Sequence, residues 1–440
     1  MPLKYFMSLP LKVLYASVLS LFALHSSAEE KYPEIISLQY ALQRAETNHP
    51  DIEQAQAALD LAGSERLEAE SLTGTTVEIK TRLRYVEPNS DVAVQTRNDS
   101  SVGLFVNKNL YDFGRSEAAE RAAELAIESE KISLHSVRNQ RRLDIMRQYF
   151  NVILSDLEYL RDNEDMATAF VSLDKARDRR SVGQLSDVEV LELEDAYQKV
   201  RLRRYRSDNK QRSTRSVLAI AMNQIGHLPA TLEDPVLPSL KRSLPDLESI
   251  MVQVQKNNPA LQAAKTRLNA AQARLEEARA SDNPLLSGEF EVSESNRALG
   301  SRDDARIGVQ LTIPLSSGGK TRANIAKERA HIRSERANLA RQHAKVEQAV
   351  LDAWIELSNL KAQYQQANAQ LDYSELYLDQ RRALYELETR TNLGDAMVRI
   401  SEAQRYLKET EFEIAYHWAQ LDALMGKTVY ASVLGTEKRQ

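Results

Sequence analysis

The chain has 440 residues, of which 28% are charged and 42% hydrophobic, and its formal net charge is −5. This length allows two or three ordinary domains. A chain without cysteine cannot form disulfides, a thiolate metal site or an acylated lipoprotein anchor. The acidic balance gives no sign of a nucleic-acid binder. Stability must therefore come from packing and assembly.

Residues 1–28 have the pattern of a signal peptide. Lys4 and Lys12 precede or flank the apolar stretch from Val13 to Leu24, and small residues follow as far as Ala28. A permanent membrane anchor is the alternative, but the apolar run is about 12 residues long and a spanning helix needs about 20. We expect cleavage before Glu29. Because no later apolar run approaches 18 residues, any membrane crossing would have to use strands.

Residues 29–225 form the first of two predicted structural repeats. After an opening helix, apolar and polar residues alternate with period two, which predicts strands at 75–86 and 100–110. A stretch without Gly or Pro then runs from Arg115 to Val182 and predicts a helix on the order of 100 Å long. A break at 183–186 separates it from a second helix, so 115–225 is a predicted helical hairpin. Its first helix carries a coiled-coil seam, made of Leu143, Met146, Phe150, Ile153, Leu157 and Leu160.

Residues 246–426 repeat the same order. An opening helix is followed by predicted strands at 285–294 and 305–314 and by a helical hairpin at 320–425. Asn48-His49-Pro50 recurs as Asn257-Asn258-Pro259, which indicates an internal duplication. A Pro-rich connector at 226–245 is expected to be extended, and 427–440 is a C-terminal tail.

Four strands with one apolar and one polar face cannot close a barrel, and an open sheet would leave two unpaired edges. Two chains would give 8 strands with a filled interior, whereas three would give 12 strands around a channel. The alternative is a soluble protein whose small sheet packs against its helices. We favour a mainly α protein with a transmembrane β part. Its polar barrel face is predicted to line the lumen through Lys80, Arg82, Arg84, Arg306 and Gln310.

The order of elements resembles that of TolC-like outer-membrane efflux proteins over essentially the whole mature chain. The most specific matches are Leu110-Tyr111-Asp112-Phe113-Gly114-Arg115 and Pro314-Leu315-Ser316-Ser317-Gly318-Gly319-Lys320. The resemblance implies a homotrimer with a 12-stranded barrel in outer-membrane lipid and a helical tunnel in the periplasm. It also implies a periplasmic adaptor and an inner-membrane ABC or RND pump as partners. The same duct would serve drug efflux or type I protein secretion.

In that family, charged residues near the helix turns close the periplasmic mouth. Here Ser181 to Glu189 resembles the first turn, with Glu189 in the acidic position, and Thr389-Arg390-Thr391 resembles the second. Gly394 stands where an acid is expected, and Asp395 follows one residue later. We expect Glu189, Arg390 and Asp395 to contribute to a gate. The alternative is that they are solvated charges at helix ends, where Asp is favoured in any case.

No enzyme, cofactor or metal site is predicted. Ser317-Gly318-Gly319-Lys320-Thr321 ends like a phosphate-binding loop, but Pro314 occupies the position of the first glycine. His331 and His343 lack the spacing of metal ligands, and Trp354 and Trp418 are interpreted as packing residues. Two rival functions stay open: a soluble periplasmic coiled-coil adaptor, and an ATP-using enzyme built on the Gly-Gly-Lys-Thr stretch.

Overall fold

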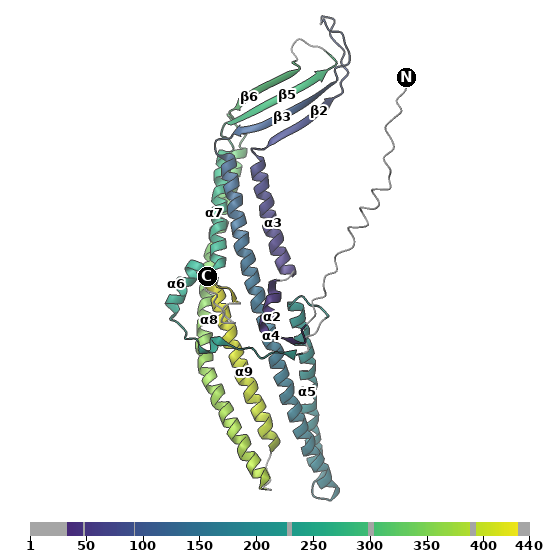
Figure 1. The fold of residues 1–440 in the computed structure, drawn as a ribbon, viewed down its shortest axis with the longest axis vertical. Coiled ribbons are helices and arrows are strands. Elements are labelled where there is room, and N and C mark those ends of the chain that lie inside the picture. Colours follow the sequence, from purple (N-terminus) through teal and green to yellow (C-terminus); the bar gives the residue numbers. More distant parts are fainter. Residues whose placement is uncertain are drawn as a thin grey trace, which may run out of the picture.

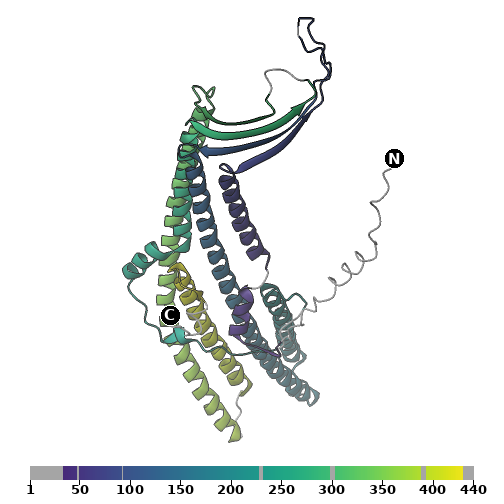
Figure 2. The same ribbon diagram turned by 45° about the horizontal axis from the view of Figure 1, so that its top comes forward.

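The computed structural model describes residues 33–46, 49–91, 93–226, 231–297, 303–387 and 393–429. The molecule is elongated, with a curved sheet at one end, long helices below it, and two helical hairpins ending together at the far end (Figures 1 and 2). The predicted signal peptide and most of the C-terminal tail lie outside the described residues.

No helix within the described ranges combines the length and apolar character needed to cross a bilayer.

Two helices, α4 (Arg115–Ser181) and α8 (Lys320–Glu386), extend from the sheet to the far tip. Each begins after a glycine with positive φ, Gly114 or Gly319. The first backbone amides of α4 are capped by Asp112, whose carboxylate accepts hydrogen bonds from Arg115 N and Ser116 N at 3.1 and 2.8 Å. A glycine turn followed by a helix start therefore aims each long helix away from its strand.

The helices lie in a row. Next to the sheet, α3 (Pro50–Ser71), α4, α7 (Pro259–Ala280) and α8 are neighbours in that order. Towards the tip the order is α5 (Asp187–Ala221), α4, α9 (Leu393–Leu424) and α8. The outer helices of the row are thus α3 and α5 on one side and α8 on the other.

The main sheet has four antiparallel strands in the order β2-β3-β5-β6. Their bounds are β2 Thr75–Arg82, β3 Ser101–Tyr111, β5 Leu285–Ser295 and β6 Ala305–Thr312. Strand β2 ends four residues before the predicted residue 86, and β6 ends before the predicted residue 314. The strands of the two repeats meet between β3 and β5, so β2 and β6 are the edges.

The sheet is not packed against the helices, as the soluble alternative required. The helices join it end-on (Figure 2). Ile79 on β2 is 73% exposed and Ile307 on β6 is 84% exposed. Side-chain hydrogen bonds hold the connections between helices and strands instead. Asn109 donates to the carbonyl of Leu72 at 2.6 Å, and Asn283 donates to that of Phe113 at 2.8 Å. Within the described chain, the apolar face of the sheet is left uncovered.

The main hydrophobic core lies halfway along the helices. The rings of Phe150 on α4 and Phe412 on α9 stack at 4.2 Å, and both are buried. Around them lie shorter elements, β1 (Ile35–Ile36), α2 (Leu38–Gln43), η1 (Arg44–Glu46), β4 (Thr231–Leu232) and η2 (Pro238–Lys241). Helix α6 (Leu247–Asn257) packs against α8 in a second core. The connector expected to be extended at 226–245 thus contains a short strand and a 3-10 turn.

Tyr149 holds the crossing chain segments to this core. Its buried hydroxyl lies 2.9 Å from the carbonyl oxygen of Ile36 and 2.6 Å from that of Glu233, beside the parallel pairing of β1 with β4. Burial raises the pKa of Tyr149, so the hydroxyl keeps the proton that it donates.

Replacing Tyr149 with Phe should lower the free energy of unfolding by about 1–3 kcal/mol, because the single hydroxyl proton that the two neighbouring carbonyls share is lost. The measurement is thermal or urea unfolding of the purified protein. Tyr385→Phe, at an exposed position on α8, is the control and should change nothing. Equal stability of Tyr149→Phe and wild type would contradict this role.

Candidate functional site

The sheet separates apolar from polar side chains. In the strand register, Ile79 faces Leu104, Leu104 faces Val292, and Phe290 faces Ile307. These residues share one face because cross-strand partners point the same way. The alternate positions carry the polar residues, among them Glu78, Lys80, Asn107, Glu289, Glu291 and Arg306.

Four of the five predicted lumen residues lie on this polar face within strands: Lys80, Arg82, Arg306 and Gln310. Two of them pair with acids, Lys80 with Glu78 at 2.8 Å and Arg306 with Glu291 at 3.3 Å. The fifth, Arg84, lies beyond the end of β2, and its Nε donates to the buried carboxylate of Asp99 at 2.6 Å. Arg84 therefore lies beyond the strand end, where the pairing of the two chain segments continues through its carbonyl and the Tyr85–Asn98 bridge.

Phe105 is a residue of the polar face that sequence reasoning did not single out. It lies opposite Glu78 and Glu291, and the ammonium group of Lys80 sits 4.8 Å from the centre of its ring. The ring lies over Gly103, where an added Cβ would come within 3.0 Å of it. The signal was present in the sequence, since Phe105 breaks the polar alternation next to a glycine.

At the far tip, Glu189 forms part of a helix cap. Its carboxylate accepts hydrogen bonds from Ser186 N and Ser186 Oγ, both at 2.8 Å, while Ser186 Oγ accepts from Glu189 N at 3.3 Å. This is a capping box at the start of α5. The bonds from Ser186 hold the pKa of Glu189 below its ordinary value, so the carboxylate stays charged.

The second turn gives a physical reason for Gly394. At this position, near the start of α9, an added Cβ would collide with the side chain of Thr168 on α4. A side chain as large as an acid does not fit there, and Asp395 lies next to it in the first turn of α9. Arg390 lies outside the described residues. The structure thus places Glu189 and Asp395 on different hairpins whose tips share one end of the molecule (Figure 1).

Between the tip and the core, ion pairs join three helices. Arg161 on α4 contacts Glu402 on α9 at 2.6 Å and the buried Asp162 at 2.7 Å. Arg203 on α5 reaches the same Asp162 at 3.1 Å, and Arg405 pairs with Glu402 at 3.0 Å. Sequence reasoning missed this network because its partners lie far apart in the chain and show no local spacing.

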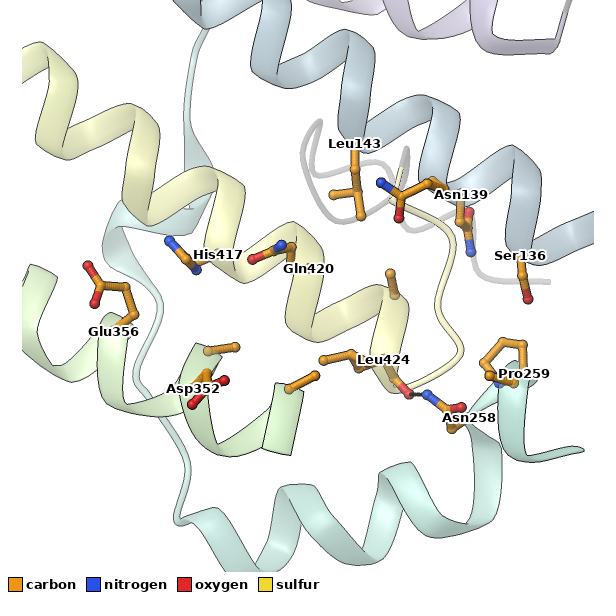
Figure 3. A pocket seen from close by; sticks show the side chains of 15 residues that line it. Ser136, Asn139, Leu143, Asn258, Pro259, Asp352, Glu356, His417, Gln420 and Leu424 are labelled. Atoms are coloured by element: carbon orange, nitrogen blue, oxygen red, sulfur yellow. Dashed lines mark hydrogen bonds between the residues drawn. The ribbon is translucent and has the colours of Figure 1, made fainter. Parts of the chain in front are cut away.

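A cavity of about 650 Å³ opens where α9 ends and α7 begins (Figure 3). The two helix ends are tied by a hydrogen bond from Asn258 Nδ2 to the carbonyl of Leu424 at 2.9 Å. Asp352 and Glu356 from α8 and His417 from α9 line it. Burial lowers the pKa of His417, which favours the neutral imidazole. Across the described ranges, no group of three or more metal-ligating side chains was found.

The phosphate-loop-like stretch has a structural role. Thr321 at the start of α8 donates its hydroxyl to Asp282 at 2.6 Å and is nearly buried. The two tryptophans pack near the core: Trp354 donates to the carbonyl of Pro245 at 3.0 Å, and Trp418 lies buried under Arg242.

The fold is that of outer-membrane efflux channels. The chain superimposes on VceC, the outer membrane protein of Vibrio cholerae, with a TM-score of 0.71 and 15% identity, covering 89% of this chain and 96% of that one. The Campylobacter jejuni CmeC outer membrane channel gives a TM-score of 0.72 at 14% identity, covering 91% and 87%.

Sequence comparison points the same way. Residues 250–427 match the family model described as outer membrane efflux protein. The chain is 24% identical over 279 residues to the outer membrane efflux protein BepC of Brucella suis, and 26% identical over 221 residues to protein CyaE of Bordetella pertussis. These matches cover 61% and 49% of this chain and 59% and 47% of the relatives, so less than two thirds of either relative is spanned. The resemblance to TolC-like outer-membrane efflux proteins is confirmed.

Gly394→Ala should push the start of α9 away from α4, because the new methyl group meets Thr168. We expect a lower melting temperature and faster amide exchange in the first turns of α9. Thr168→Ala in the same chain should restore much of the loss. Gly63→Ala on α3, where the space is open, is the control and should be neutral or slightly stabilising. A neutral Gly394→Ala variant would refute the close approach.

The contact between α4 and α9 should weaken in acid. Burial alone would raise the pKa of Glu402, but hydrogen bonds from Arg405 and Arg161 outweigh it and hold the pKa below its ordinary value. The stabilisation is therefore present above the ordinary carboxyl pKa and is lost as the pH falls through the lowered value. Hydrogen exchange of α9 measured from pH 7 to pH 3 should show this loss. In the Glu402→Gln variant, hydrogen exchange of α9 should change less between pH 7 and pH 3 than in the wild type. The same pH dependence in both proteins would count against the network.

Proposed function

We propose that three copies of this chain form an outer-membrane channel, with a 12-stranded barrel in the lipid and a helical tunnel in the periplasm. The observation that carries the proposal is a row of elements with two free edges. One edge consists of β2, α3 and α5, and the other of β6 and α8. Both run the length of the molecule, so a neighbouring copy can continue sheet and helices together.

The strand edges favour closure with other copies. Strands β2 and β6 each pair on one side only, and exposed strand edges invite pairing with another chain. Two copies would make 8 strands, whose interior side chains fill, while three make 12 and leave a water-filled lumen. Cyclic symmetry closes such a ring without leaving an edge.

The two faces of the sheet suit lipid outside and water inside. The uncovered apolar face carries residues such as Ile79, Val309 and Ile307, and in lipid this face would be buried rather than exposed. The polar face would then line the lumen with Lys80, Arg82, Arg306 and Gln310, as transmembrane barrels require.

The outer helices each carry a second heptad stripe. On α8 the residues opposite the α9 seam are Ile355, Ala362, Ala369, Leu376 and Ala383, spaced by seven and exposed. On α5 the corresponding exposed apolar residues form two pairs, Val188 with Leu191 and Leu202 with Tyr205, separated by Asp195 and Gln198. Exposed apolar residues at heptad spacing are a surface for another helix. A neighbouring copy would fill each one.

The channel would carry solutes or polypeptides outward without chemistry of its own. A periplasmic adaptor and an inner-membrane ABC or RND pump would dock at the tips and supply the energy. Glu189, Asp395 and Arg390 would contribute rings of charge near this mouth. The names of BepC, an efflux protein, and CmeC, an outer membrane channel, support export, and both drug efflux and type I secretion fit the same duct.

Matched substitutions on β6 test the proposal. Val309→Arg places a charge on the lipid side and should cost about 2–4 kcal/mol near the bilayer midplane, so outer-membrane recovery and conducting channels should fall sharply. Gln310→Arg, the next residue on the opposite face, should still insert and should shift ion selectivity towards anions.

The readouts are membrane fractionation, mass of the purified oligomer, and single-channel recording in planar bilayers. Recovery of the wild-type protein in the soluble periplasm would refute the channel, as would equal insertion of both variants.

A further inference from the structure

We propose that Arg201 on α5 of one copy pairs with Asp372 and Glu375 on α8 of the next, and that this contact sets the axial register of the subunits. The inference rests on the proposed trimer and specifies one of its interfaces. It concerns exposed charges well above the helix turns, so it is separate from the proposed gate.

Among the residues that the structure describes, Arg201, Asp372 and Glu375 have no partner of opposite charge. Arg201 contacts Gln198 Oε1 at 3.4 Å and lies 5.9 Å from the ring of Tyr205. Asp372 and Glu375 are exposed, and over the described residues neither forms an ion pair. Most other bases of α5 are already paired within the chain, as Arg203 with Asp162, Lys210 with Glu158 and Arg215 with Asp156 show.

Arg201 and Asp372 lie at the same distance from the ends of their helices. Helix α5 starts at Asp187 and α8 ends at Glu386, and both ends are at the tip (Figure 1). The segments 187–201 and 372–386 are equal in length, so Arg201 and Asp372 are equally far from the tip, roughly 20 Å at the rise of an α-helix. Glu375 is one turn nearer the tip.

The three residues also lie on the same surface of the helical layer that the copies would form. The seam of α5 against α4 includes Val190 and Ser207, and the seam of α8 against α9 includes Ala367 and Ser374. Relative to these seams, Arg201 and Glu375 occupy heptad position e and Asp372 position b. Helix α5 of one copy and α8 of the next would run antiparallel, and each has its seam on the side facing away from the other. In that arrangement, the e and b positions of both helices lie on the same surface of the helical layer.

Matching charges at this interface would act mainly on register. The exposed stripes of Leu202 and Tyr205 on α5 and Leu376 on α8 supply non-directional contact, which allows sliding by a helical turn. A slip would leave Arg201 without its acids, so the charges distinguish one alignment from its neighbours. Three-fold symmetry repeats the contact three times.

Charge reversal tests the pairing. Arg201→Glu should raise the dissociation constant of the detergent-solubilised trimer by at least about tenfold, because three acidic residues would then face each other at every interface. The triple variant with Arg201→Glu, Asp372→Arg and Glu375→Arg should recover it. Arg206→Glu is the matched control. Arg206 is exposed on the same helix, and in the proposed alignment it comes level with Gln366 of α8 rather than with an acid, so this variant should leave assembly unchanged.

Cross-linking gives a second readout that does not depend on assembly strength. The chain has no cysteine, so Arg201→Cys with Glu375→Cys can be joined by a short bismaleimide without background. Covalent trimers are expected. Arg177→Cys with Glu194→Cys, at an exposed ion pair between α4 and α5 of one chain, should cross-link within that chain and run as a monomer on a denaturing gel.

The outcomes separate the two proposals. A conducting trimer that gives no cross-link, or in which reversal at Arg201 has no more effect than at Arg206, overturns this register and leaves the channel standing. A protein that is monomeric in its native membrane overturns both.

Discussion

The unpaired backbone groups of the two outer strands are the constraint on which the rest of the structure depends. Strands β2 and β6 each offer a free row of amides and carbonyls, and the sheet between them has an apolar face that no helix of the described chain covers. In water such a sheet would invite association, and in a bilayer every backbone polar group must be paired. The helices show the same feature: among the described residues, α8 and α5 carry exposed apolar side chains on the side away from their hairpin partners. In the proposed channel, one subunit is a section of the wall, and neighbouring copies supply the partners that its edges lack.

Local order could be predicted well from the sequence, because it depends on short-range chemistry. Alternation with period two gives strands, the long stretches without Gly or Pro give α4 and α8, and the glycines before them give the turns. Strand ends were less predictable. The alternation continues to Arg84, yet the strand is interrupted after Arg82, where the amide of Arg84 donates to the hydroxyl of Ser100 before the pairing resumes between Tyr85 and Asn98. The side chain of Arg84 meets Asp99 across this pairing. That partner is fifteen residues away and leaves no mark on the periodicity.

The candidate site shows the same division between local and distant contacts. Ser186 and Glu189 are three residues apart, so a capping box can be read from their spacing alone. Gly394 looks like a departure from the family's acidic position, and only the approach of Thr168 from another helix explains it. The pairing of Arg161 with Glu402 joins residues in different repeats. No sequence period connects them, because a hydrogen bond between distant segments depends on the completed row of helices.

The seam between α4 and α9 changes character along its length, and this decides where the two hairpins are most firmly joined. Near the middle of the molecule it is apolar, with Phe150 stacked on Phe412, so its strength depends on buried area and little on pH or salt. Towards the tip it becomes polar, through Arg161 and Glu402. Nearest the tip, the backbone of α9 at Gly394 lies close to the side chain of Thr168 on α4. Polar contacts with partial exposure contribute modest free energy and respond to pH and ionic strength. The seam inside the α8/α9 hairpin changes in the same way. It is apolar at Val350, Leu357 and Leu360, level with the core, whereas towards the tip Gln363 donates to Thr410 at 3.1 Å and Arg399 lies over the ring of Tyr377. Both seams are therefore held most firmly at the level of the apolar core.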